Sequence, residues 1–151
     1  MAQATCAKAV DATRAQPAGG WTVIQYNLLK DWLSTIVPGL TFRLGPDMLE
    51  MADRAGLVTP MQGLGLSVDG NFDRPAFQIT IRGLQSQVDF TPADDANAID
   101  KALIWGDYPH TLWGDHVIGV SRVGGSPVPN DVLDKGRRAL WTCTYWFECP
   151  L

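Results

Sequence analysis

The clearest strand in the sequence is Phe77-Gln78-Ile79-Thr80-Ile81-Arg82-Gly83, in which apolar and polar side chains alternate. A period of two places Phe77, Ile79 and Ile81 on one face of an extended segment and the polar residues on the other. We therefore predict a strand over 75–83 with one buried face and one face toward solvent or a partner.

A second strong strand is predicted over Leu140–Cys149, which is rich in aromatic residues. Trp141 and Tyr145 share one face of this segment, and Trp146 lies on the other. Bulky groups on both faces are typical of a central strand, or of one whose outer face is covered by a helix or a neighbouring subunit.

Three further segments have weaker strand patterns. Residues 40–44 alternate apolar and polar residues, and residues 116–123 carry Ile118 and Val120 on one face. Residues 61–68 include Gly63 and Gly65, and glycine weakens a strand. We expect that last segment to be a weak strand or an irregular edge.

A helix is predicted from Thr22 to Val37. Thr22 and Gln25 form a capping box at its start, and Pro38-Gly39 ends it. Its apolar residues recur at spacings of three and four, which predicts a buried stripe. The stripe comprises Trp21, Ile24, Leu28, Trp32 and Ile36, widened by Leu29, Leu33 and Val37.

A second main helix is predicted to start at Thr91, which would cap it, with Pro92 in its first turn. Ala96, Ile99 and Leu103 give this helix its buried stripe. A smaller helix is expected between residues 46 and 56.

These elements predict an α+β fold, with a small mixed, mainly antiparallel sheet packed by two main helices and a long Gly/Pro-rich loop before the last strand. The length of 151 residues corresponds to one domain, which we place at residues 21–151. Residues 1–20 are rich in alanine and lack the apolar core of a secretory signal, so we expect an N-terminal arm.

Charge and hydropathy exclude several classes of function. The net charge of -4 and the pI of about 4.9 give no global basic field for holding nucleic acid or an anionic membrane. No stretch is apolar over the length needed for a membrane span. We therefore predict that the protein neither grips nucleic acid nor inserts into a membrane.

No motif of catalytic, cofactor or metal chemistry is complete. Asp69-x-Asn71-x-Asp73 begins like a calcium loop, but Arg74 and Thr80 occupy the positions that need Gly and Glu. The three cysteines have no C-x-x-C spacing, and neither histidine belongs to a zinc or nucleophile motif. We predict a non-enzymatic protein without a cofactor or a metal.

The tripeptide Trp-Gly-Asp occurs twice, at 105–107 and at 113–115. The favoured interpretation is a pair of turns whose tryptophans pack on the core. The alternative is an exposed contact loop formed by Trp105, Tyr108 and Trp113.

The loop over 124–136 is long for a connection between paired strands. It is either a flexible surface turn or an arm that enters a groove of the next subunit in a ring. The candidate interface residues are Gly124, Gly125, Pro127, Val128, Pro129, Val132, Leu133, Asp134, Arg137 and Arg138.

The order of these motifs resembles the minor virion proteins of long-tailed bacteriophages, above all the tail terminator family, also called minor capsid or tail-completion proteins. The similarity covers about Trp21 to Pro150, and no single residue is diagnostic. Family members commonly carry Gly-Gly-Pro in the loop, whereas Ser126 separates the glycines from Pro127 here. The motifs are, in order, Phe77–Gly83, a helix containing Ala96–Leu103, Val117–Val123, Gly124–Pro127, Asp134–Arg137 and the aromatic strand.

The resemblance implies a virion protein of the tail or neck, made in the host cytoplasm. It would form a hexameric ring that caps the tail tube and provides the head–tail joining surface. Its expected partners are its own copies, the tail-tube protein and a head-completion or connector protein, and DNA would pass through the ring without specific binding. The alternatives are a tail-tube subunit, a head-completion protein or, more distantly, a small ligand-binding or hydrolytic domain with a pocket around His110, Asp115 and His116.

Overall fold

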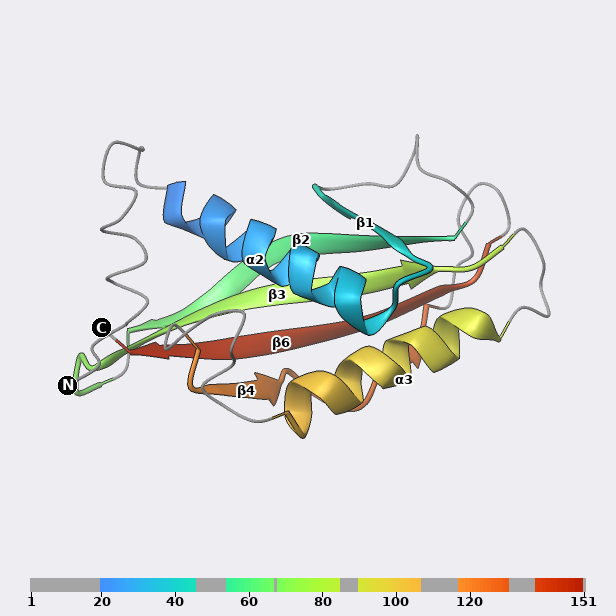
Figure 1. Cartoon of the computed structure of the whole chain (residues 1–151). Helices are drawn as coiled ribbons and strands as arrows, with labels where there is room; N and C mark the ends of the chain where they lie inside the picture. Colours follow the sequence, from blue (N-terminus) through green and yellow to red (C-terminus); the bar gives the residue numbers. More distant parts are fainter. Residues whose placement is uncertain are drawn as a thin grey trace.

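A computed structural model of the chain describes residues 20–45, 54–66, 68–84, 90–106, 117–130 and 138–150, with side chains from residue 28 onward in the first helix. Along the chain each of the two described helices is followed by three strands, and all six strands belong to one sheet (Figure 1). The elements are α2 (Gly20–Ile36), β1 (Thr41–Leu44), β2 (Ala55–Leu66), β3 (Phe72–Arg82), α3 (Thr91–Ile104), β4 (Gly119–Arg122), β5 (Val128–Pro129) and β6 (Leu140–Pro150).

The six strands form one sheet in the order β1-β2-β3-β6-β4, with β5 also paired to β6. Only the β1–β2 pair is parallel, and the other pairs are antiparallel. This confirms the predicted α+β class and the mainly antiparallel sheet. β6 lies between β3 and the short strands β4 and β5, so the aromatic strand is central, as its two apolar faces predicted.

Both helices lie on one face of the sheet, with α2 toward the β1 side and α3 toward the β4 side (Figure 1). The strands supply alternate residues to this face, including Phe77, Ile79 and Ile81 of β3, which are buried as predicted. Residues of β6 oppose them in register, such as Tyr145 opposite Phe77. The main core therefore lies between the sheet and the helix pair.

The predicted helix at Thr22–Val37 is confirmed as α2, but its buried stripe is shifted. Leu29 and Leu33 are fully buried and Trp32 nearly so, whereas Leu28 and Ile36 are only half-buried. The side chains of Trp21 and Ile24 lie outside the described set. The buried face of α2 therefore combines Trp32 of the predicted stripe with Leu29 and Leu33, which were predicted only to widen it.

The predicted weak strand or irregular edge over 61–68 corresponds to the second half of β2, a longer strand of 12 residues whose first half was not predicted. β1 pairs with β2 only at residues 55–58, so only that first half lies between two strands. Gly56 lets the Phe42 ring cross the strand, since a Cβ at Gly56 would lie 2.4 Å from that ring. A change of register between Met61 and Gly65 absorbs the other glycines as a bulge.

The start of α3 also differs from its prediction. Phe90 is the N-cap residue and makes no side-chain cap hydrogen bond, so Thr91 is not the cap but the first helical residue. The predicted stripe of Ala96, Ile99 and Leu103 is buried. The expected small helix lies mostly outside the described residues, and its last two positions, Ala55 and Gly56, are in β2 instead.

Candidate assembly surface

The structure describes only part of the candidate interface. Of its residues, Gly124, Gly125 and Pro129 are exposed, Val128 is 57% exposed, and Pro127 is buried. Arg138 is half-buried just before β6. The remaining candidates, Val132, Leu133, Asp134 and Arg137, lie outside the described residues.

Residues 123–130, which we call the edge segment, lie along the edge of the sheet. The Val123 N–H donates to the Thr144 carbonyl at 2.8 Å, and the Asn130 N–H donates to the Leu140 carbonyl at 2.8 Å. Between these two anchors, β5 pairs with β6 in antiparallel register. This half of the long loop is therefore attached to the sheet by backbone hydrogen bonds.

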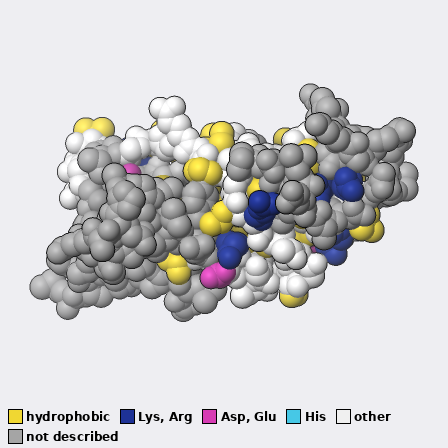
Figure 2. All heavy atoms as spheres, turned by 90° about the horizontal axis from the view of Figure 1, so that it is seen from above, with side chains coloured by type: hydrophobic (Ala, Val, Ile, Leu, Met, Phe, Trp, Pro, Cys, Tyr) yellow, Lys and Arg dark blue, Asp and Glu magenta, His cyan; other side chains and the backbone are white. Residues whose placement is uncertain are grey.

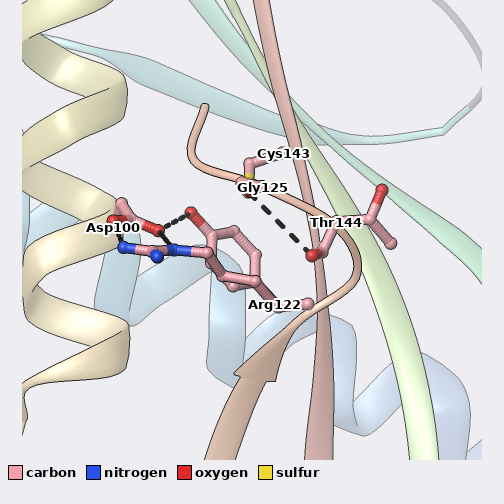
Figure 3. A network of polar contacts seen from close by, with 6 residues as sticks. Asp100, Arg122, Gly125, Cys143 and Thr144 are labelled. Atoms are coloured by element: carbon pink, nitrogen blue, oxygen red, sulfur yellow. Dashed lines mark hydrogen bonds and ion pairs between the residues drawn. The ribbon is translucent and has the colours of Figure 1, made fainter. Parts of the chain in front are cut away.

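The middle of the edge segment forms a wide bulge. Arg122 opposes Tyr145 and Val128 opposes Thr142, so residues 123–127 lie opposite only two residues of β6. Gly124 has a φ of +90°, a conformation that favours glycine. The bulge passes close to Cys143, whose Sγ lies 3.8 Å from the Gly125 carbonyl oxygen (Figure 3).

A buried polar network fixes the position where the edge segment begins. Arg122, the last residue of β4, donates to Asp100 of α3 through Nε at 2.7 Å and Nη2 at 2.5 Å, and the two side chains point toward one another in Figure 3. The buried hydroxyl of Tyr145 on β6 donates to the same carboxylate at 3.0 Å. Two forked hydrogen bonds set both the position and the orientation of the guanidinium.

Sequence reasoning missed this network, although one signal was present. Asp100 lies on the buried stripe of α3, directly after Ile99 and three residues before Leu103. A carboxylate at such a position needs a buried hydrogen-bonding partner. The sequence could not indicate which of the distant residues supplies it.

The protonation of the network suits a structural role. The hydrogen bond between Arg122 and Asp100 raises the pKa of the Arg122 guanidinium. Burial raises the pKa of the Cys143 thiol and that of the Tyr145 phenol. Because the thiolate is the nucleophilic form of cysteine, a raised pKa makes the free thiol of Cys143 less reactive.

Beside the edge segment lies a hollow of about 260 Å³. Its lining is mixed, with Val123, Val128, Asn130 and the hydroxyl residues Thr142 and Thr144 among it. Thr142 donates to the Asn130 side chain at 2.9 Å, so part of this polar lining is already paired. The hollow is therefore a recess that a protruding side chain could enter.

The proposed contact loop around the tryptophans is described only at its start. Trp105 follows α3 and is 77% exposed, so the prediction that it packs on the core is wrong. The helix ends at Ile104, which leaves Trp105 off the buried stripe. Tyr108 and Trp113 lie outside the described residues, as do His110, Asp115 and His116.

Within the described ranges, no group of His, Cys, Asp and Glu side chains could hold a metal ion. Neither described helix combines the length and the apolar content needed to cross a membrane. No protein-family model matches the chain, and a search of curated proteins gives no significant match.

Proposed function

We propose that the chain is a non-enzymatic virion protein, a tail terminator that assembles as a ring on the tail tube of a long-tailed phage. In this proposal the ring is hexameric, it prevents further growth of the tube, and its far side receives a head-completion protein. The observation that most supports this proposal is the edge segment, an exposed strand edge whose conformation is fixed before any partner binds.

Two features of the edge segment favour contacts between subunits. Val123 and Val128 are large apolar residues that remain exposed although they lie on ordered backbone. Ordering a flexible loop on binding costs conformational entropy. A segment that is already hydrogen-bonded to β6 loses less entropy when it binds. Such a segment can contact a partner tightly over a small area.

The buried polar groups support a structural role more than a catalytic one. The Asp100 carboxylate accepts hydrogen bonds from Arg122 and from Tyr145 at the junction of α3, β4 and β6. The network lies behind the edge segment and braces it against α3. The network therefore holds the edge segment in position, and a ring subunit needs such a fixed contact surface.

The first experiment is electron microscopy and native mass spectrometry of the purified chain, alone and mixed with tail tubes. We expect closed rings that bind one end of a tube. Long filaments of the chain alone would assign it to the tube subunits instead. A monomer that neither forms rings nor binds tubes would contradict both roles.

A matched pair of variants tests the edge segment itself. Val128→Asp places a charge on the exposed edge, and we expect it to lose rings while the fold persists. Val68→Asp makes the same change at a fully exposed position of the β2–β3 turn and should leave the rings intact. Rings of equal stability in both variants would contradict the role of the edge segment.

A further inference from the structure

The two edges of the sheet differ from each other, and the outermost strands are short. β1 forms part of one edge, and β4, continued by β5, forms the other. β1 and β4 each contain four residues. A ring needs two different surfaces on each subunit, and an open sheet with two unlike edges offers such a pair.

The outward backbone groups of both edges follow from the hydrogen bonds already made. The Gly45 N–H donates to the Val58 carbonyl of β2, so the backbone N–H and C=O groups of the odd-numbered residues of β1 point toward β2. The backbone groups of Phe42 and Leu44 therefore point away from the sheet. The Val123 N–H donates to the Thr144 carbonyl, so the backbone groups of the odd-numbered residues of β4 point toward β6. The backbone N–H and C=O of Val120 therefore point away from the sheet.

Opposite charges lie on the two edges. Arg43 is exposed on β1, on the sheet face away from the helices. Figure 2 looks onto the molecule from above, and its Lys and Arg side chains lie in the middle and toward the right of this face, with an acidic side chain beside those in the middle. At the other edge Glu148 is exposed beside Gly119, and its Oε2 lies 3.3 Å from where a Cβ of Gly119 would stand.

We propose that β1 of one copy pairs with β4 of a second copy in antiparallel register, with Arg43 opposite Gly119. This inference rests on the proposed ring and identifies the subunit contact. Alternation along both strands then places Arg43 on the same face as Glu148, and only the side chain of a glycine, a hydrogen atom, separates them. The outward groups of Phe42 and Val120 face each other as a hydrogen-bonded pair.

The chain directions agree with this pairing. β1 runs parallel to β2, and three antiparallel steps lead from β2 through β3 and β6 to β4. β4 therefore runs opposite to β1, and a neighbouring copy in the same orientation presents its β1 antiparallel. The same register brings the exposed Pro38-Gly39 turn of one copy to Val123 and Gly124 of the next.

Charge disfavours the symmetric pairing of two β1 strands, because it would bring two copies of Arg43 together. Like charges in directly opposed positions destabilise strand pairs. Beyond Arg122 the bulge and Pro129, which has no N–H, limit the backbone hydrogen-bond pairing, though not every contact, to the four residues of β4.

The test is charge reversal at both edges, read by analytical ultracentrifugation. We expect Arg43→Glu and Glu148→Arg each to weaken self-association about tenfold or more, because each opposes like charges across the contact. The double variant should recover association. An equimolar mixture of the two single variants should also recover it, as rings in which the variants alternate.

Two controls separate the contact from the fold and from the ring. Lys101→Glu reverses an exposed charge on α3 and should leave association unchanged. Thermal unfolding of every variant should match the parent, because both edge residues are exposed. Undiminished association in both single variants would overturn the edge pairing while leaving the ring proposal intact, whereas a parent chain that never self-associates would overturn both.

The register is tested independently by cross-linking. Arg43 and Gly119 would be a non-hydrogen-bonded pair, whose side chains lie closest in antiparallel strands. The variant Arg43→Cys with Gly119→Cys should form covalent oligomers on mild oxidation, since opposed Cα atoms fall within disulfide range. Moving the second cysteine to Ser121 shifts it two residues, and equal cross-linking there would contradict the register.

Discussion

The central strands β3 and β6 and the edge formed by β4 and β5 belong to one sheet, yet different interactions hold them. β3 and β6 pair over nearly their whole length and bury Phe77, Tyr145 and Phe147 under the helices. The edge has short pairings, exposed valines and one ion pair that ties it to α3.

The difference separates stability from contact. Apolar burial stabilises a fold in proportion to the area removed from water, so the core should tolerate little change. The edge contributes few buried groups, so most of its exposed residues are free to serve a partner. Substitutions in the centre should therefore unfold the chain, and substitutions at the edge should alter association first.

The largest effect is expected for Phe147→Ala. The Phe147 side chain is 0% exposed, and its ring meets that of Phe77 edge to face at a centroid distance of 5.3 Å. Removing a buried aromatic ring costs about 3–5 kcal/mol of unfolding free energy. Urea denaturation measures this loss, and Val128→Ala at the exposed edge should stay within about 0.5 kcal/mol of the parent.

The next effect is expected for Asp100→Ala, which breaks the link between core and edge. It leaves the Tyr145 hydroxyl without its acceptor and removes the partner of Arg122. Removing one partner of a buried pair costs about 3–5 kcal/mol, and we expect about 2–3 because the Arg122 side chain is 30% exposed.

Two controls accompany this variant in the same denaturation series. Asp94→Ala removes an exposed carboxylate of the same helix and should have little effect. Tyr145→Phe removes only the hydroxyl and should cost about 1 kcal/mol. A loss at Asp100 no larger than that at Asp94 would show that the network does not hold the edge.

Alkaline pH should also separate the regions. Burial raises the folded pKa of Cys143 and Tyr145 above the unfolded values. Above about pH 8.5 the unfolded chain therefore binds fewer protons than the folded one, and the free energy of unfolding falls as pH rises. The slope is at most about 1.4 kcal/mol per pH unit for each group.

Denaturation at several pH values tests this sign. Cys143→Ala should flatten the decline that begins near pH 8.5, and Tyr145→Phe should flatten the part above about pH 10, where an unfolded tyrosine ionises. Below pH 8 neither Cys143 nor Tyr145 should contribute a pH dependence to the free energy of unfolding, in the parent or in either variant. Curves parallel to the parent from pH 8 to 11 would contradict the burial of these groups.

Sequence patterns identified the central elements because their periodicity is local. The alternation in β3 and the apolar spacing of α2 and α3 each reflect a face that meets the core. Sequence patterns predicted only a weak strand or an irregular edge over 61–68 and missed the first half of β2, because Gly56 and Gly63 argue against a strand. Both glycines are required by contacts with residues distant in the sequence, since a Cβ would clash with the Phe42 ring at Gly56 and with the Arg74 carbonyl at Gly63.

The candidate surface was only partly predictable for the same reason. Composition identified a Gly/Pro-rich segment before the last strand, but nothing local indicated that Val128 and Pro129 pair with β6. The partner of Asp100 is 22 residues away at Arg122 and 45 away at Tyr145. Such contacts depend on the topology of the sheet, which no periodicity encodes.

The smallest expected effect compares two neighbouring glycines of the bulge. Gly124 has a φ of +90°, whereas the φ of Gly125 lies outside the left-handed range, and a Cβ added at either glycine would meet no atom within 4 Å. Gly124→Ala should therefore cost about 1 kcal/mol through backbone strain alone. Gly125→Ala should be neutral or slightly stabilising, because alanine restricts the unfolded chain.

Urea denaturation of both variants, alongside sedimentation, relates this strain to assembly. If the bulge contacts the next subunit in its present shape, Gly124→Ala should weaken association more than Gly125→Ala, although both add only a methyl group. Equal association would mean that the partner does not depend on the backbone at Gly124. The contact would then reside in β4 itself, where Arg43 of the next copy is proposed to lie.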